Sequence, residues 1–185
     1  MGGRSPGSAS ALRTNSGLWE EAIGAGNGRL PPIDKQNPDT EGLAMVSFDD
    51  LHTQNHQIAE LAKVLNYLFE DREMCDTELA CELFERYREK FDDHMDHNRE
   101  IYSALYSGGG HEGGTTANRF MEGEREIKRV FHTYANKWCK RGLQIDDHGQ
   151  FCRETQKMFQ LVHDRIQAES EQLYPLARKA LAPET

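Results

Sequence analysis

Histidine and carboxylate side chains at helical spacing are the residues of this chain best suited to chemistry. The chain has eight histidines, a number that suggests metal binding. When each helical segment is projected at about 100° per residue, only His94 lies in the centre of an apolar stripe. Glu169 lies on the apolar stripe of a later segment, and Asn55 and Asn98 are inward-facing amides. We therefore expect His94 and Glu169 to meet in the interior, either as a hydrogen-bonded polar pair or as ligands of a single, weakly held metal ion. Four histidines are expected to face outward: His52, His56, His132 and His163.

Four helical patterns must position these side chains. In each of them, apolar residues recur at three- and four-residue steps, which is typical of amphipathic helices, and no β-strand pattern is present. The first segment begins near Ser47, and the others cover about 77–105, 117–139 and 148–181. Short connections between such helices favour an all-α, antiparallel up-and-down four-helix bundle.

Several local signals predict how these helices begin, bend and connect. Asp49 or Asp50 is expected to cap the first helix, and Asp147 is expected to cap the fourth. Pro175 lies inside the fourth pattern and predicts a kink there. The connection at 107–116, SGGGHEGGTT, predicts a flexible loop between the second and third helices. It is not a phosphate-binding loop, because no Lys follows the glycines.

The composition of residues 1–44 predicts a disordered leader, which precedes a helical domain that covers residues 45–185. The leader holds eight of the sixteen glycines and has no helical or strand period. It also has few large apolar residues that could offset the entropy lost on ordering. Because Met45 stands just before the first helical pattern, a translation start at Met45 is an alternative to a start at Met1.

Composition excludes several classes of function. The net charge of −9 disfavours nucleic-acid binding, which needs clustered Lys and Arg. No apolar run reaches the roughly 20 residues that span a bilayer, and no secretory signal opens the chain. We therefore expect a cytoplasmic protein without a membrane partner. Its four cysteines, none of them in a CxxC pair, are then free thiols rather than zinc ligands or disulfides. A protein partner or a homo-oligomer is compatible with this composition.

Three sequence runs resemble the hemerythrin-like family, also known as HHE cation-binding domains. They are LHTQNHQIAELAKVL in the first helix, DDHMDHNREIYSAL in the second and RIQAESEQLYPLA, the most specific of the three, in the fourth. The resemblance extends over about residues 47–182. It implies a four-helix bundle that holds two irons in its centre through His ligands and bridging carboxylates, with an open position for dioxygen.

The chain departs from the family's pattern at most of the ligand positions that the resemblance implies. Only His94 and Glu169 match, whereas two irons need about five His and two bridging carboxylates. The pattern therefore disfavours a standard diiron centre and predicts either no cofactor or weakly bound iron. Five implied positions carry other residues: Asn55, Gly123, Ile127 and Arg165 stand in place of His, and Asn98 stands in place of the bridging Glu.

Two functional hypotheses follow from the resemblance and its departures. The first is a hemerythrin-like bundle with a degenerate metal site that acts as a non-enzymatic binding or regulatory protein. The alternative is an iron-binding protein that handles dioxygen, nitric oxide or iron through a non-standard ligand set. A ferritin-like carboxylate oxidoreductase is disfavoured, because no inward-facing E-x-x-H motif occurs. The alternative would need the bundle to recruit further histidines by helix rotation: His52, His56, His97 and His163.

Overall fold

The computed structural model describes residues 47–139, 143 and 145–182, so the leader predicted at 1–44 lies outside the described residues. Within them every regular element is helical, which confirms the all-α prediction for this part of the chain. The elements, in chain order, are α1 (Phe48–Phe69), α2 (Arg72–Cys75), α3 (Glu78–Gly108), α4 (Gly110–Trp138), α5 (His148–Ala168), the π-helical turn η2 (Glu169–Leu173) and α6 (Tyr174–Leu181).

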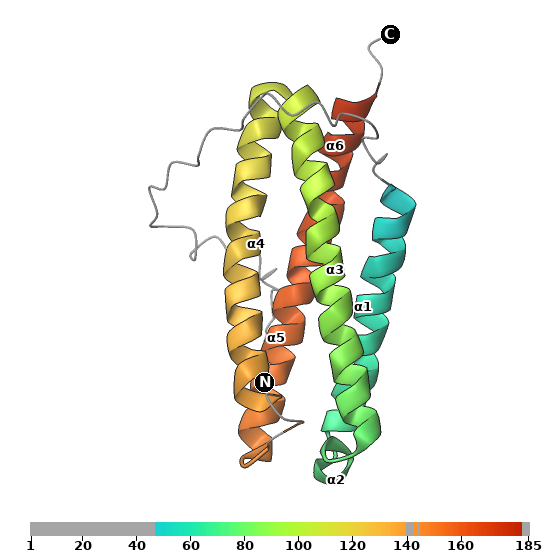
Figure 1. The fold of residues 1–185 in the computed structure, drawn as a ribbon, viewed down its shortest axis with the longest axis vertical. Helices are drawn as coiled ribbons and strands as arrows, with labels where there is room; N and C mark the ends of the chain where they lie inside the picture. The colour runs from blue at the N-terminus through green and yellow to red at the C-terminus, as the bar shows by residue number, and fades with distance from the viewer. Residues whose placement is uncertain (1–46, 140–142, 144, 183–185) are drawn as a thin grey trace, which may run out of the picture.

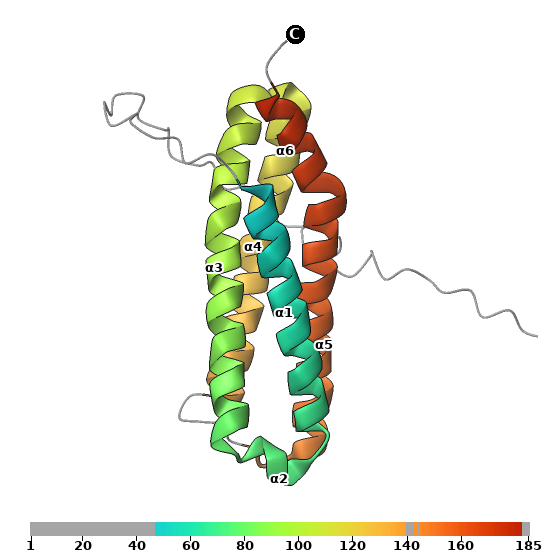
Figure 2. The ribbon, with the colours of Figure 1, turned by 90° about the vertical axis from the view of Figure 1, so that its right-hand side faces the viewer.

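Four long helical rods lie side by side along the longest axis of the molecule (Figure 1 and Figure 2). Three of them are α1, α3 and α4, and the fourth is α5 continued by η2 and α6. Both α3 and α5 pack against α1 and α4. The short helix α2 links α1 to α3 at one end of the molecule, the α2 end, and α6 lies at the opposite end, the α6 end.

Side chains that accept hydrogen bonds from the first helical turn fix where α1 and α5 begin. Ser47 Oγ accepts from the backbone N–H of Asp50 at 3.2 Å, so the prediction that Asp49 or Asp50 caps α1 was wrong. These two aspartates lie inside the first turn instead, where their charges favour the positive end of the helix. Asp147 caps α5 as predicted, through a 2.8 Å bond from the N–H of Gln150.

The glycine-rich segment 107–116 is not the flexible loop that its composition predicted. α3 and α4 run through this segment and leave only Gly109 between them. Gly110 has a positive φ of 58°, and a Cβ on Gly109 or Gly113 would lie 2.6 or 2.8 Å from the backbone oxygen of Leu105. The glycines therefore let two helix ends turn sharply against each other, and close backbone contact explains them better than chain flexibility.

The fourth rod is interrupted just before Pro175, where a kink was predicted. Regular α-helix ends at Ala168, and in the π turn that follows, the N–H of Tyr174 donates to the carbonyl of Glu169, five residues back. Proline lacks an N–H and its ring crowds the preceding turn, and a wider π turn accommodates both defects. Figure 2 shows the rod bending at this point, so that α6 leans over the end of the molecule.

Two apolar clusters fill the space between the rods, and buried polar residues separate them. The aromatic cluster, toward the α2 end, includes Phe84, Tyr87, Phe91 and Phe131. The smaller cluster, toward the α6 end, includes Phe120. Between the two lies the polar layer, which consists of six buried residues: Asn55, His94, Asn98, Glu124, Arg165 and Glu169.

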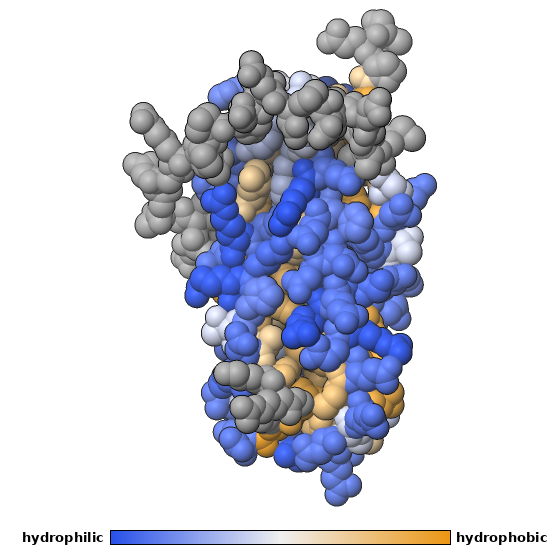
Figure 3. Space-filling model, in the orientation of Figure 1, coloured by the Kyte–Doolittle hydropathy of each residue, from blue (hydrophilic) through white to orange (hydrophobic). Residues whose placement is uncertain are grey.

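The face of the bundle that Figure 3 shows is mainly hydrophilic. Figure 3 shows polar side chains over most of one face, with apolar side chains reaching the surface toward the α2 end. Among the described residues, no helix combines the length and the apolar character that crossing a bilayer requires. The burial of apolar side chains between the rods therefore accounts for the fold, and the polar layer is the part that needs a separate explanation.

Candidate functional site

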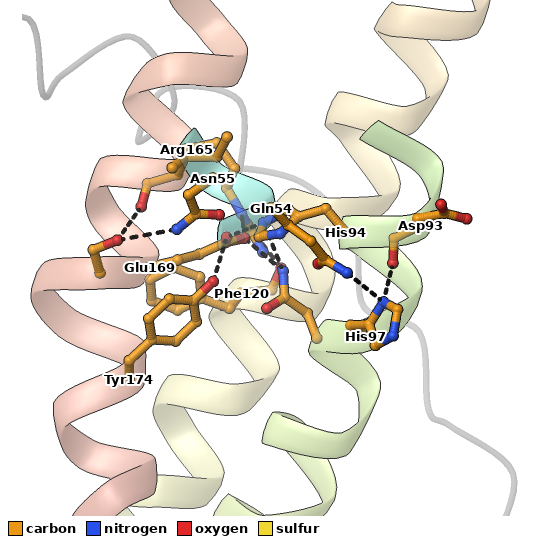
Figure 4. A network of polar contacts seen from close by, with 12 residues as sticks. Gln54, Asn55, Asp93, His94, His97, Phe120, Arg165, Glu169 and Tyr174 are labelled. Atoms are coloured by element: carbon orange, nitrogen blue, oxygen red, sulfur yellow. Dashed lines mark hydrogen bonds and ion pairs between the residues drawn. The ribbon is translucent and has the colours of Figure 1, made fainter. Parts of the chain in front are cut away.

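Glu169 is the centre of the polar layer. It is the first residue of η2, its side chain is fully buried, and both carboxylate oxygens accept hydrogen bonds (Figure 4). Oε1 accepts from Arg165 Nε at 2.5 Å and from Asn98 Nδ2 at 3.0 Å. Oε2 accepts from His94 at 2.7 Å and from the hydroxyl of Tyr174 at 3.4 Å. The predicted meeting of His94 and Glu169 is thus confirmed.

Arg165 supplies the positive charge opposite Glu169. One turn before Glu169 on the same rod, it is only 5 % exposed, and three of its nitrogens donate hydrogen bonds. Besides the bond to Glu169, Nη1 donates to the carbonyl of Phe120 at 3.0 Å and Nη2 donates to the hydroxyl of Tyr102 at 2.9 Å. The guanidinium also lies over the Phe120 ring, 4.8 Å from its centroid. These contacts hold its charge in one place.

Gly123 provides the room for that guanidinium. A Cβ at this position would lie 2.9 Å from Arg165 Nη1, closer than packed atoms allow. Gly123 and Arg165 are two of the positions where the resemblance implies His. The absent side chain at one position and the long cationic side chain at the other therefore fit each other.

The electrostatics of the layer favour a fixed ion pair. Burial alone would raise the pKa of Glu169, but the charge of Arg165 and the contact with His94 outweigh it and lower that pKa to about 2. Burial would lower the pKa of Arg165, yet the charge of Glu169 raises it overall. Burial raises the pKa of both Tyr102 and Tyr174. At neutral pH the Glu169 carboxylate therefore faces the Arg165 guanidinium, and the two neutral phenols of Tyr102 and Tyr174 border the layer.

The orientation of His94 follows from the ionised state of Glu169. A carboxylate can only accept, so His94 Nε2 carries a proton and donates it to Glu169. The other ring nitrogen, Nδ1, is buried and has no hydrogen-bond partner among the described residues. Because the two ring nitrogens point in different directions, His94 and Glu169 could bind one ion together only by breaking their own hydrogen bond.

The structure separates the two asparagines and the remaining histidines as the helical projection predicted. Asn55 and Asn98 are buried, and the amide of Asn55 donates to the hydroxyl of Ser170 at 3.4 Å. His97 is exposed, and its Nδ1 lies 3.2 Å from Gln54 Nε2. The four histidines that were predicted to face outward are all exposed: His52, His56, His132 and His163.

The sequence analysis identified Arg165 at a position where the resemblance implies His, but it did not predict that Arg165 pairs with Glu169. The spacing of four residues between Arg165 and Glu169 could have revealed their pairing, because such residues share one face of a helix. Glu124, also missed, is 8 % exposed and pairs with Lys128 at 3.1 Å, again four residues on. Tyr102 gave no such local signal, because its partner lies on another helix.

The donor set does not fit the diiron centre that the resemblance implies. Among the described residues, no group of three or more His, Cys, Asp or Glu side chains is arranged to hold a metal ion. Gly123 and Ile127 offer no ligand atom, and Arg165 places a cation directly on Glu169. Both oxygens of Glu169 already accept hydrogen bonds from protein donors. A metal would therefore have to displace Arg165 or His94 from the carboxylate.

Comparisons with known proteins add no relative to this picture. No protein-family model matches the sequence, and neither the curated proteins nor the solved structures gave a match. The assignment of a function thus rests on the chemistry of the polar layer itself.

Proposed function

We propose that this chain is a hemerythrin-like, antiparallel up-and-down four-helix bundle whose degenerate metal site is closed by an internal ion pair. In this proposal it acts as a non-enzymatic binding or regulatory protein. The observation that carries the proposal is the buried guanidinium of Arg165, which donates to Glu169 at 2.5 Å. It supplies the positive charge that metal ions would otherwise supply to an inward-facing carboxylate.

The paired identities of Gly123 and Arg165 support this proposal further. A histidine at position 123 and the arginine at position 165 would compete for the same space, because a Cβ at 123 lies 2.9 Å from the guanidinium. The two residues therefore act together: one position loses its ligand, and the other fills the space with a cation. A random loss of single ligands would leave the carboxylate unpaired, which is costly in a buried site.

Two groups of the buried network, Glu169 and Tyr102, are poorly suited to general acid–base catalysis. General acid–base chemistry needs a group whose pKa lies near the working pH, but the pKa of Glu169 is lowered to about 2 and burial raises that of Tyr102. A surface hollow of about 390 Å³ lies between α4 and the η2–α6 part of the fourth rod, lined in part by Arg119 and Lys179. No residue of the polar layer lines that hollow. These features favour binding over turnover.

The cysteines support a reducing, cytoplasmic setting for this function. All four are free thiols in the described structure. Such thiols persist where glutathione and thioredoxin keep them reduced. The partner in this proposal is a protein, either a different chain or a second copy of this one, and the acidic net charge of −9 disfavours nucleic acid.

The alternative, an iron protein that handles dioxygen, nitric oxide or iron, draws on one observation. The buried Nδ1 of His94 has no hydrogen-bond partner among the described residues. Further ligands would have to come from histidines that are now exposed, such as His56 and His163. That rearrangement requires helix rotations that would expose the aromatic cluster, so the ion-pair proposal is preferred.

Elemental analysis of the purified full-length chain, with an ultraviolet–visible spectrum, tests the proposal. The protein is produced in iron-rich medium and is compared with a His94→Leu variant. We expect both proteins to be colourless and to contain well below one iron per chain, because Arg165 already neutralises Glu169. Two irons per chain that are lost in the His94→Leu variant, together with an oxo-bridged diiron absorption, would refute the proposal and restore the alternative.

A further inference from the structure

Two cysteines from distant parts of the chain meet at the α2 end of the molecule. Cys75 is the last residue of the single-turn helix α2, and Cys152 lies in the second turn of α5. Both sulfur atoms lie near the carbonyl oxygen of Phe69, the Cys75 Sγ at 3.8 Å and the Cys152 Sγ at 3.1 Å, and the Cys75 thiol also donates to the carbonyl oxygen of Asp71 at 3.3 Å. The two thiols are therefore gathered around one oxygen atom, although they belong to different helices.

The position of Phe69 explains why the thiols converge there. Phe69 is the last residue of α1, and the final carbonyls of a helix lack partners within it. Side chains from α2 and α5 supply the missing donors, since His148 Nε2 also lies 2.7 Å from the same oxygen. Cys152 Sγ is in turn 3.3 Å from His148 Nε2. Helix capping thus brings two thiols and an imidazole N–H together.

The two thiols differ in their access to solvent. Cys75 is fully buried, whereas Cys152 is partly exposed. Burial raises the pKa of both, that of Cys75 to about 11, so neither reacts quickly at neutral pH. An oxidant from solvent therefore reaches Cys152 first, and His148 Nε2 lies 3.3 Å from its sulfur.

We propose that Cys75 and Cys152 form a reversible disulfide when a hydroperoxide oxidises the protein. In the first step the Cys152 thiolate attacks the peroxide, an S–O bond forms, the O–O bond breaks, and hydroxide leaves and takes up a proton to become water. Cys152 is then a sulfenic acid. In the second step the sulfur of Cys75 attacks that of Cys152, the S–S bond forms, the S–O bond breaks, and a second water leaves with the thiol proton. Two thiols are oxidised by two electrons, and hydrogen peroxide is reduced to two waters.

The other two cysteines provide the reference for this reaction. Cys139, where burial raises the pKa to about 12, lies just after α4, and Cys81 lies in the first turn of α3. No shared hydrogen-bond acceptor holds these two sulfurs together in the described part of the chain, unlike Cys75 and Cys152. The proposed bond would join α2 to α5 and so fasten the connection between α1 and α3 to the start of the fourth rod.

The test uses the full-length chain with Cys81→Ser and Cys139→Ser, which leaves only the proposed pair. Circular dichroism first verifies that its helix content equals that of the wild type. The protein is treated with hydrogen peroxide, its thiols are counted after unfolding, and its peptides are mapped by mass spectrometry without reduction. We expect both thiols to disappear, the mass to fall by that of two hydrogen atoms, one peptide pair to be linked through Cys75 and Cys152, and dithiothreitol to restore both thiols.

Cys75→Ser in the same background is the matched control. It keeps the exposed thiol and lacks the resolving one, so Cys152 should advance to sulfenic and sulfinic acid without a linked peptide. Three results with the two-cysteine protein would overturn the proposal. These are retention of both thiols, sulfinic acid on Cys152 while Cys75 stays free, and a disulfide that joins two separate chains.

Discussion

The aromatic cluster and the polar layer occupy neighbouring cross-sections of the same four rods, yet different forces hold them together. In the aromatic cluster, Phe91 and Phe131 stack with ring centroids 4.2 Å apart, and Tyr87 meets Phe159 edge-on at 4.7 Å. Such contacts depend mainly on shape and on the apolar area removed from water. In the polar layer each donor of Arg165 has one particular acceptor.

Because different forces hold the two regions together, we expect them to respond differently to substitution. A smaller apolar residue in the aromatic cluster loses area and leaves a cavity, but it leaves no charge behind. A single change in the polar layer leaves a buried carboxylate or guanidinium without its partner, which costs more than the pair itself contributes. The polar layer therefore fixes how the helices align along one another, whereas the aromatic cluster supplies most of the apolar burial.

The largest expected effect is that of Arg165→Met. The substitution keeps an apolar stem but removes the charge, and the buried Glu169 then has no counter-ion. We expect the free energy of unfolding to fall by about 3–5 kcal/mol in urea titrations at neutral pH. Arg119→Met is the matched control, because Arg119 is partly exposed and lies 5.4 Å from the same Phe120 ring. Arg119→Met should lower the free energy of unfolding by less than about 1 kcal/mol. Equal losses for Arg119→Met and Arg165→Met would contradict the account.

Lowering the pH should reduce the free energy of unfolding by somewhat less than the Arg165→Met substitution does. Because the pKa of Glu169 is about 2 when folded and near 4.5 when unfolded, the unfolded chain takes up the proton first as the pH falls. The lowered pKa of Glu169 contributes roughly 3 kcal/mol to the free energy of unfolding. This contribution is complete above pH 4.5 and is lost as the pH falls toward 2. Glu169→Gln should be less stable at neutral pH but change less across this window. Glu126→Gln, at an exposed site, should keep the acid sensitivity of the wild type.

Gly123→Ala should destabilise the protein by a smaller amount, although alanine normally stabilises a helix relative to glycine. Alanine favours a helix over glycine by about 1 kcal/mol, but the new Cβ displaces Arg165 from its acceptors. We expect a net loss of about 1 kcal/mol, comparable to one hydrogen bond. Gly114→Ala offers a control in the same helix, because its Cβ would meet only the Tyr106 ring at 3.9 Å. Stabilisation by both variants would mean that the guanidinium does not occupy the space beside Gly123.

His56→Ala should have the smallest effect of all. His56 is exposed on α1, on the face opposite the buried Ile58 and Leu65. We expect the free energy of unfolding to change by less than about 0.5 kcal/mol in thermal or chemical unfolding. A larger loss, or a change in metal content, would place His56 in the interior and would require a different rotation of α1.

The sequence was sufficient to predict most of the polar residues that face inward, although it missed Glu124. Helical periodicity placed Asn55, His94, Asn98 and Glu169 on inward faces, because a helix of regular pitch fixes the direction of each side chain, and the family resemblance added Arg165 at an implied ligand position. All five are buried in the structure. What periodicity could not supply was the set of contacts between them, since these depend on how neighbouring helices slide along one another.

The features that the sequence did not predict depend on close backbone contact or on very short elements. The glycines around the junction of α3 and α4 looked like a flexible loop, because composition does not reveal that Gly109 and Gly113 lie against Leu105. The single-turn helix α2 is too short to show a period. Ser47 was passed over as a cap, because two aspartates follow it closely and are equally good capping residues by type.

The most direct test of the central claim, that Arg165 is the internal counter-ion of Glu169, is a double-mutant cycle. The unfolding free energies of the wild type, Arg165→Met, Glu169→Gln and the double variant are measured under one set of conditions. We predict a coupling energy of at least about 2 kcal/mol, with the double variant more stable than the two single losses would add up to. Additive losses, with a coupling energy near zero, would show that the two charges do not depend on each other and would contradict the account.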